Sequence, residues 1–249
     1  MADVKEKKQE KPENEDAELE EMIRVGLHFG HKKTKKHPKM DPYLFGVRSG
    51  VNIIDVSKTK EMLSRALNFA SSLISENKMI LLVGTKVQLK DIVRETAEEC
   101  GLPYVNERWL GGTITNFGNI KKRVDYLKEM EKKKEEGELE KYTKKEKLKI
   151  DGEISALKTK MEGLKLLDKV PAAVFVLDIT HDDLAVKEAK AKGLKVIAIT
   201  DTDANPELAD YPIPANDDAL LAVSYILGKF KEVVIEAKNR IKTEDIAQN

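Results

Sequence analysis

The chain of 249 residues contains one cysteine, four histidines and few aromatic side chains, and it carries no net charge. Because Cys100 is the single cysteine, the sequence excludes an intrachain disulfide framework and a cysteine-rich zinc module, and it fits a reducing compartment. No apolar run reaches the roughly 18 residues of a membrane span, and the N-terminus does not resemble a signal peptide. We therefore expect a cytoplasmic protein. Since 44 basic residues balance 44 acidic ones, any attraction for a polyanion must come from local charge.

Charged residues make up 35% of the chain, above the usual quarter, and they gather in residues 1–21 and 119–165. Residues 1–16 hold too few apolar groups to offset the entropy of ordering them, so we predict a disordered acidic tail there. Residues 243–249 are predicted to be a flexible C-terminus. The remainder has the composition of an ordinary globular domain.

Between the charged segments, apolar runs alternate with helical patterns. Buried strands are predicted near residues 79–84, 104–105, 172–178 and 194–201, and helices near 17–25, 57–73, 92–100, 182–192 and 220–241. Ser57 is the expected cap of the second helix. Alternation on both sides of Arg48-Ser49-Gly50 predicts a β-hairpin. Strands that are apolar throughout favour a parallel sheet covered on both faces, so we predict a three-layer α/β domain from residues 17–118 and 166–242.

Residues 119–165 interrupt that domain with a second pattern. Apolar residues recur there at spacings of four and three, at Ile150, Ile154, Leu157, Met161 and Leu164. Thr143 and Glu146 form a capping box that starts a new helix after Gly137. We predict an inserted helical hairpin with one narrow apolar seam, a coiled coil that protrudes from the sheet domain.

The sequence lacks the signatures of nucleotide enzymes. It has no Gly-x-Gly-x-x-Gly, no phosphate loop ending in Gly-Lys-Ser/Thr and no Gly-x-Ser-x-Gly. Asp178 and Asp201 each end a predicted strand, with Asp203 close behind, at the edge where open α/β sheets bind ligands. Such carboxylates could hold Mg²⁺ in a phosphotransfer or hydrolytic enzyme, the alternative function. Because no base, nucleophile or phosphate loop accompanies them, we favour a role in capping turns and helices.

Positive charge gathers in one early segment. Residues 24–48 contain seven Lys and Arg side chains and one Asp, a net charge of +6, enough for several contacts with a nucleic-acid backbone. Aromatic and imidazole planes beside a glycine, as in His28-Phe29-Gly30-His31, can stack on unpaired bases. A solvated lysine-rich loop is the alternative that composition alone leaves open.

Three histidines of the same segment invite a metal interpretation. His28, His31 and His37 could supply nitrogen ligands. We disfavour this site because no fourth ligand is in view and five neighbouring lysines would repel a divalent cation.

Residues 106–116 form the other unusual stretch and hold the only Trp. Arg108 is a fork donor suited to phosphate or guanine, and the pair Gly111-Gly112 allows another backbone to approach. Physical chemistry alone favours a structural account, in which Trp109 fills the core, the glycines make a tight turn and Thr115 caps the next helix.

Seven motifs, in order and at suitable spacings, resemble the bacterial family of the second protein of the small ribosomal subunit. They are Val25-Gly-Leu-His-Phe-Gly-His31, His37-Pro-Lys-Met40, Tyr43-Leu-Phe-Gly46, Ile53-Ile-Asp55 followed by Lys58-Thr59, Val83-Gly-Thr-Lys86, Arg108-Trp-Leu-Gly-Gly112 followed by Thr115-Asn116, and Asn216-Asp-Asp-Ala219. The resemblance spans about residues 19–240.

This resemblance implies a Rossmann-like or flavodoxin-like sheet domain with a protruding coiled coil, placed between the head and body of the small subunit. It implies contact with small-subunit ribosomal RNA and neighbouring ribosomal proteins, including the large mRNA-binding protein that it helps to recruit. It implies no catalysis, no cofactor, no membrane contact and no homo-oligomer.

Local charge and the resemblance together predict the RNA-contacting residues. They are His28, Phe29, Gly30, His31, Lys32, Lys33, Lys35, Lys36, Lys39, Arg48, Arg108, Trp109, Lys121, Lys122 and Arg123. Many relatives have Arg and Trp where this chain has Lys35, Lys36 and His37, so lysine charge has to replace stacking there.

Overall fold

A five-stranded parallel sheet forms the centre of the protein, in a computed structural model that describes residues 13–141 and 143–248. The strand order is β5-β4-β6-β7-β8, and every neighbouring pair is parallel. The strands are β4 (Ile80–Val83), β5 (Tyr104–Val105), β6 (Ala173–Val176), β7 (Lys195–Thr200) and β8 (Tyr211–Pro214). All residues of β4 and β6 are buried, as expected for strands covered on both faces.

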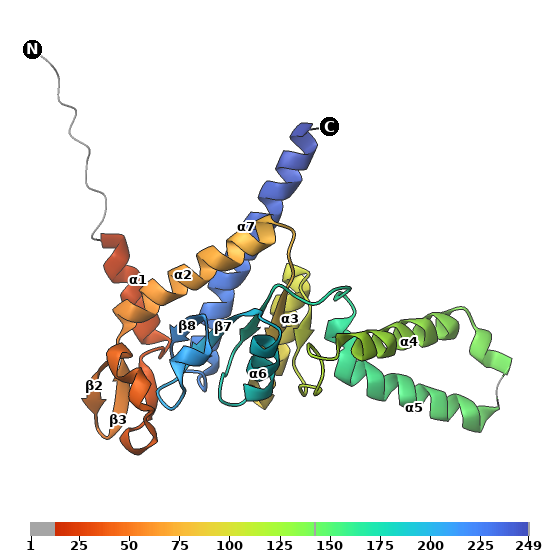
Figure 1. Ribbon diagram of the computed structural model, residues 1–249, viewed down its shortest axis with the longest axis horizontal. Helices are drawn as coiled ribbons and strands as arrows, with labels where there is room; N and C mark the ends of the chain where they lie inside the picture. Colours follow the sequence, from red (N-terminus) through yellow and green to blue (C-terminus); the bar gives the residue numbers. More distant parts are fainter. Residues whose placement is uncertain (1–12, 142, 249) are drawn as a thin grey trace, which may run out of the picture.

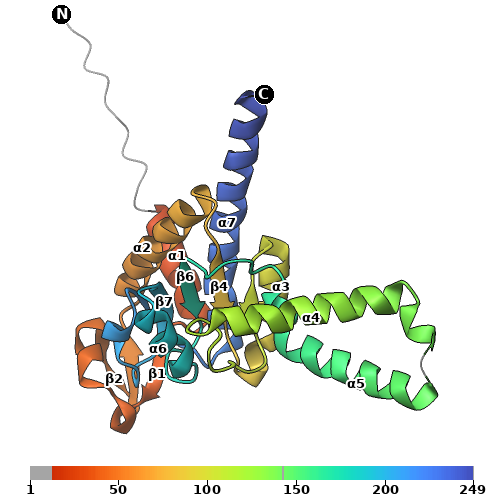
Figure 2. The same ribbon diagram turned by 45° about the vertical axis from the view of Figure 1, so that its right-hand side comes forward.

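Helices cover both faces of this sheet (Figure 1, Figure 2). One face packs on α1 (Glu13–Arg24), α2 (Val56–Ser75), α3 (Lys90–Cys100) and α7 (Leu220–Gln248), and the other packs on α4 (Phe117–Glu135), α5 (Lys144–Met161) and α6 (Asp183–Ala191). Alternate residues of β4 separate the two cores: Ile80 and Leu82 face the first, Leu81 and Val83 the second. The predicted Rossmann-like arrangement of a parallel sheet between helices is confirmed.

Helices α4 and α5 form the inserted helical pair, which extends away from the sheet (Figure 1). The side chains nearest the sheet are buried, including Ile120, Val124, Leu127 and Ile154. The helices are connected through η4 (Glu138–Lys141) at the far end. Thr143 and Glu146 make both hydrogen bonds of the predicted capping box.

A second, three-stranded antiparallel sheet lies beside the C-terminal edge of the first. Its order is β1-β3-β2, with β1 (Phe29–Lys32), β2 (Leu44–Arg48) and β3 (Val51–Ile54). The predicted hairpin is confirmed, and its turn places Ser49 and Gly50 at positive φ. Short 3-10 turns η1 (Lys33–Lys35) and η2 (Pro38–Tyr43) connect β1 to β2.

Four local predictions were wrong. Helix α1 begins at Glu13, so residues 13–16 are helical rather than disordered; three of these four residues are acidic, a type that favours a helix N-terminus. Residues 1–12 of the predicted tail lie outside the described residues. Helix α7 continues to Gln248, because no Gly or Pro interrupts the chain after residue 241, whereas a flexible end was predicted from 243. Asp55 rather than Ser57 caps α2, and β8 was not predicted.

Among the described residues, no helix is both long and apolar enough to cross a membrane.

Candidate nucleic-acid interface

The first half of the predicted RNA-binding segment is a strand rather than a loop. Strand β1 pairs with β3, and the buried Asn52 side chain donates to the carbonyl oxygen of His31 at 3.0 Å. The backbone N–H of Lys33 donates to Gly50 at 2.9 Å. The sequence shows no apolar alternation at residues 29–32, so pairing with β3 supplies the order that local pattern did not indicate.

Four cationic side chains of the small sheet and of the adjoining turn η1 are exposed and are here called the basic surface: Lys32, Lys33, Lys35 and Arg48. The register places Lys32 opposite Val51 and Val51 opposite Arg48, so Lys32 and Arg48 lie in one row across the sheet. Within residues 13–141 and 143–248, no ion pair involves any of the four. The charges of Lys32, Lys33 and Arg48 are available to a ligand, whereas the charge of Lys35 also acts on Asp218 and helps to lower the pKa of that carboxyl.

Two other predicted lysines are less available. Lys36 forms an ion pair with Asp41, and Lys39 forms one with Glu207. His37 accepts a hydrogen bond from the Lys39 backbone N–H at its Nδ1, 3.2 Å away, and so caps η2.

An apolar hollow of about 600 Å³ lies beside the basic surface. It is lined by His28, Phe29, Phe45, Gly46, Val47, Arg48, Ser49, Val51 and Ile53. Phe45 is 82% exposed and Phe29 49%, which is unusual for large apolar side chains. The centre of the His28 ring lies 4.0 Å from that of the Phe29 ring, and the His28 Nδ1 is buried without a hydrogen-bond partner among the described residues. Burial and the nearby charge of Arg48 lower the pKa of His28, so its ring is neutral at pH 7.

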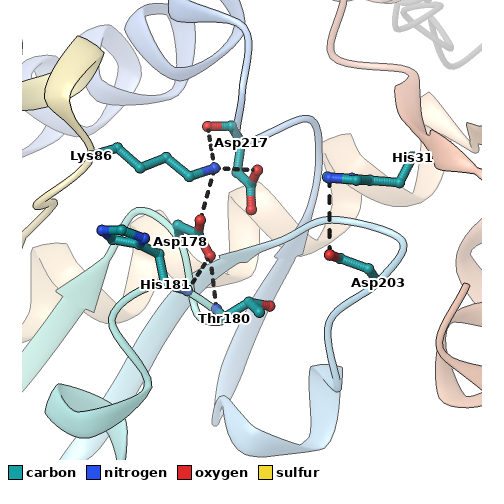
Figure 3. A pocket seen from close by; sticks show the side chains of 7 residues that line it. All are labelled: His31, Lys86, Asp178, Thr180, His181, Asp203 and Asp217. Carbon is teal, nitrogen blue, oxygen red and sulfur yellow. Dashed lines mark hydrogen bonds and ion pairs between the residues drawn. The ribbon is translucent and has the colours of Figure 1, made fainter. Parts of the chain in front are cut away.

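The half-buried residues His31 and Gly30 of β1 face the loop that follows β7. The His31 Nδ1 lies 3.1 Å from Asp201, and its Nε2 lies 3.6 Å from Asp218. The Nε2 also lies 3.9 Å from Asp203 (Figure 3). A Cβ atom on Gly30 would lie 2.3 Å from the Thr202 side chain, so glycine is required by internal packing. The carboxylates that surround His31 would repel a phosphate, which disfavours the predicted RNA contacts of these two residues.

Asp201 controls the charge of His31. The hydrogen bond to Asp201 raises the pKa of His31 to about 9; burial opposes this rise and the neighbouring carboxylates add to it. His31 is therefore a cation at pH 7.

Lys86 binds Asp178, one of the three predicted carboxylates, together with Asp217 (Figure 3) and Asp218, which were not predicted. Its Nζ lies 2.7 Å from Asp178, 2.8 Å from Asp217 and 2.7 Å from Asp218. Burial disfavours its charge, but these carboxylates outweigh burial and raise the pKa of Lys86. Asp178 also accepts from the backbone N–H groups of Thr180 and His181, which confirms its predicted capping role.

This geometry does not fit either predicted metal alternative. In the described part of the chain, no group of three or more His, Cys, Asp or Glu side chains is arranged to hold a metal ion. His28, His31 and His37 have separate environments, at the apolar hollow, the carboxylates and the η2 cap respectively.

The loop after β5 is hydrogen-bonded to one buried side chain, Glu188 of α6. Its carboxylate accepts from the Trp109 indole N–H at 3.1 Å, from the backbone N–H groups of Gly112 at 2.7 Å, Ile114 at 3.1 Å and Thr115 at 3.0 Å, and from the Thr115 hydroxyl at 2.9 Å. Burial alone would raise the pKa of Glu188, but these hydrogen bonds outweigh burial and lower it. The carboxylate is ionised at pH 7.

The same contacts decide which residues of this loop are accessible. Trp109 is 7% exposed, so its predicted role in filling the core is confirmed and its ring does not offer a stacking platform to RNA. The Thr115 hydroxyl binds Glu188 instead of capping α4. Arg108 is exposed, and no hydrogen bond or ion pair to another described residue engages its guanidinium.

Comparison with known proteins gives one consistent result. Residues 22–237 match the family Ribosomal protein S2. The small ribosomal subunit protein uS2 of Dehalococcoides mccartyi strain 195 is 41% identical over 228 residues, which cover 92% of this chain and 93% of the relative. The uS2 proteins of strains BAV1 and CBDB1 of the same organism are 40% identical over the same shares. This chain belongs to the ribosomal protein S2 family.

Membership of the ribosomal protein S2 family corrects the enzyme alternative. The family is structural and non-enzymatic, and the resemblance inferred from seven sequence motifs is confirmed. The Asp178 carboxylate, predicted as the alternative Mg²⁺ ligand, is paired with Lys86, and Asp201 is paired with His31.

The S2 family chain also carries cations on α4, where Lys121, Lys122 and Arg123 were predicted to contact RNA. Lys121 pairs with Asp125 at 3.4 Å and with Asp168 at 2.5 Å. Lys122 and Arg123 are exposed, and in the portion of the chain that the structure describes neither takes part in an ion pair.

Sequence reasoning missed two residues of this S2 chain, Lys86 and Glu188. A signal existed for Glu188: its neighbours Ala185, Val186 and Ala189 form the buried face of α6, and an acid at that face requires partners. Lys86 lies in one of the seven motifs, but the motif does not show what the lysine binds, because its carboxylate partners follow β6 and β8, far away along the chain.

Proposed function

We propose that this chain is a structural protein of the small ribosomal subunit that binds small-subunit ribosomal RNA between the head and the body. In this proposal the basic surface (Lys32, Lys33, Lys35, Arg48) and the cations Arg108, Lys122 and Arg123 contact phosphates. Residues 17–118 and 166–242 form one α/β unit, and residues 119–165 project from it as a coiled coil. The protein acts in the cytoplasm as a single copy in each subunit.

One observation supports RNA binding most strongly: in an electroneutral chain, four exposed cations of β1, η1 and β2 form no ion pair with a carboxylate of the described residues. Elsewhere in the described chain many lysines have acidic partners, such as Lys165 with Glu131 and Glu162, and Lys195 with Asp210. Segregated, unpaired cations create the local positive field that attracts a polyanion even when total charge is zero. Family membership makes ribosomal RNA the polyanion of choice.

The apolar hollow supports contact with a protein neighbour. Phe29, Phe45 and Val47 expose large apolar side chains next to Arg48. An exposed apolar patch with polar residues at its rim is typical of protein-binding surfaces. We assign this hollow to the large mRNA-binding protein that, on this proposal, the chain helps to recruit.

The RNA-binding proposal is tested by the salt dependence of binding. The triple variant Lys32→Ala, Lys33→Ala, Lys35→Ala should bind small-subunit ribosomal RNA more weakly, because its RNA complex releases fewer counterions. The slope of log affinity against log salt should flatten by roughly 0.7 to 0.9 for each phosphate that is no longer neutralised. Filter binding at several salt concentrations measures the slope.

A matched control removes three cations from α7, which extends away from the small sheet (Figure 1). This control is the triple variant Lys229→Ala, Lys231→Ala, Arg240→Ala. It changes the net charge by the same amount, and its salt slope should be nearly that of the wild type. Equal flattening in both variants would mean that total charge, not the basic surface, determines binding, and would overturn the assignment. Phe45→Ser should weaken association with the mRNA-binding protein while leaving the salt slope for RNA intact.

A further inference from the structure

Glu188 is a buried residue of helix α6 that binds the loop after β5. This loop carries the exposed side chain of Arg108. Its two oxygens accept five hydrogen bonds from the segment Trp109–Thr115, and the donors are one indole N–H, three backbone N–H groups and one hydroxyl, all of them neutral. Burying a carboxylate is costly unless such donors compensate it. The Glu188 carboxylate therefore needs the loop donors to remain buried as an anion, and the loop needs the carboxylate to satisfy its donors.

A second anchor lies on the other side of Arg108. The Asn106 amide donates to the Lys90 carbonyl oxygen at 2.9 Å, and Glu107 forms an ion pair with the Lys90 ammonium. Arg108 thus stands between an anchor at the start of α3 and the Glu188 anchor that begins with Trp109. Since Trp109 is buried and Arg108 is exposed, the two anchors fix the backbone on both sides of Arg108 and so turn the start of its side chain toward solvent.

The loop backbone is shaped to meet this carboxylate. Gly112 has φ of +90°, which favours glycine, and its N–H makes the shortest of the five hydrogen bonds with Glu188. The Thr113 N–H donates to Leu110 at 3.0 Å, closing the turn that brings Ile114 and Thr115 back to the same carboxylate.

We propose that Glu188 is a positioning residue for RNA binding: it fixes the 109–115 loop so that the Arg108 guanidinium meets a phosphate of ribosomal RNA. The inference rests on the RNA-binding function proposed above and deepens it, because it adds a residue that touches no RNA. A guanidinium held in one direction loses less conformational entropy when it binds a phosphate.

Glu188→Gln tests this inference with almost no change in side-chain volume. In either orientation of the new amide, its NH₂ group faces at least two donors of the loop, so two or more hydrogen bonds cannot form and the loop rearranges. We expect Arg108→Ala to weaken binding to small-subunit ribosomal RNA roughly tenfold at fixed salt and to flatten the salt slope by the amount of about one phosphate. Glu188→Gln should reproduce both effects.

The double variant provides the decisive measurement. If Glu188 acts through Arg108, adding Glu188→Gln to Arg108→Ala should cause little further loss of affinity and no further change of slope. The losses of affinity caused by Glu188→Gln and by Lys32→Ala should add, since Lys32 lies on the three-stranded sheet, apart from Glu188 and the loop it binds. Fully additive losses for Glu188→Gln and Arg108→Ala, or a normal slope in a folded Glu188→Gln variant, would overturn the inference.

Folding is followed in the same samples. Trp109 is the single tryptophan, and its indole N–H binds Glu188, so its fluorescence reports the local rearrangement while circular dichroism reports the whole fold. Should Glu188→Gln fail to fold, Thr115→Val removes only the hydroxyl hydrogen bond and should give a smaller loss of affinity in the same direction, absent in the Arg108→Ala background. A normal Arg108→Ala slope beside a flattened triple-lysine slope rejects this inference alone; normal slopes in both reject the proposed function.

Discussion

The β1 segment and the 106–116 loop present cations in the same way but are held by different chemistry. Each has a cationic outer side, Lys32 with Lys33 in the first and Arg108 in the second, and each has an inner side that binds a buried carboxylate. In β1 the donor to Asp201 is the imidazole of His31, and in the loop the donors to Glu188 are an indole, a hydroxyl and three backbone N–H groups.

The difference determines what can disturb each segment. Imidazole titrates within a few pH units of neutrality, whereas backbone and indole N–H groups do not titrate in water. The loop therefore depends on one residue, Glu188, and the β1 segment depends on one protonation state, that of His31. Removing Glu188 should therefore disturb the loop, whereas a change of pH should disturb the β1 segment.

Removal of the loop anchor should have the largest effect. Glu188→Ala leaves five donors without their acceptor, three of them on the buried or half-buried residues Trp109, Gly112 and Ile114, so we expect the free energy of unfolding to fall by about 3–5 kcal/mol. Urea denaturation followed by Trp109 fluorescence measures this change. Lys187→Ala, on the exposed side of the same helix, is the control and should stay within about 0.5 kcal/mol of the wild type.

A loss below about 1 kcal/mol for Glu188→Ala would break the comparison, because the loop would then be held by its own turn and by Trp109 packing.

The next largest effect should be the dependence of stability on pH. The pKa of His31 is raised to about 9 in the folded protein, above its ordinary value of 6.5. Its contribution is therefore fully present below pH 6.5 and is lost as the pH rises through 9, up to about 3 kcal/mol. Urea denaturation of wild type and His31→Gln between pH 6 and 10 measures it: the advantage of the wild type should shrink with rising pH.

Asp217 contributes in the same direction, since burial and the charges of Asp178 and Asp201 raise its pKa to about 8. Asp217 is present in both proteins, and its charge is among those that raise the pKa of His31. The difference between wild type and His31→Gln therefore reports the imidazole together with its interaction with Asp217. Glu188, whose pKa is lowered, contributes stability that is lost only in acid and is silent in this range. A wild-type advantage that is constant from pH 6 to 10 would contradict the assigned role of His31.

The fold could be predicted where the chain carries its own pattern. Strands β4, β6 and β7 are continuous apolar runs that only a sheet covered on both faces can bury. Strand β8 contains Pro212 and Pro214, which argue against a strand; it forms at the sheet edge, where it pairs only with β7 and the missing N–H groups break no ladder. Strand β1 has no pattern of its own and depends on β3.

The sequence could predict which residues give the candidate site its charge, but not which side chains face solvent and which face the interior. The sequence identified Lys32, Lys33, Lys35 and Arg108 as cations, and the structure exposes them. It could not show that Gly30 and His31 face inward, because their partners Thr202 and Asp201 lie about 170 residues away along the chain. The alternative of an internal role was weighed for Trp109, whose size suggested it, but not for the small residue Gly30.

Gly30 gives the smallest and most specific test of the comparison. Gly30→Ala would bring a Cβ within 2.3 Å of Thr202 Cγ2 and 2.8 Å of Thr202 Oγ1, and that same hydroxyl accepts the His31 N–H. Thr202 can yield only by rotating away from this hydrogen bond, so we expect a loss of roughly 1–2 kcal/mol in the free energy of unfolding without any RNA present. Gly46→Ala, in the same small sheet with open space around it, should change stability by less than about 0.5 kcal/mol. If Gly30→Ala left the free protein as stable as Gly46→Ala and impaired only RNA binding, close approach of a nucleic-acid backbone, and not packing on Thr202, would be the reason for glycine, and the β1 segment would present its inner side to the ligand after all.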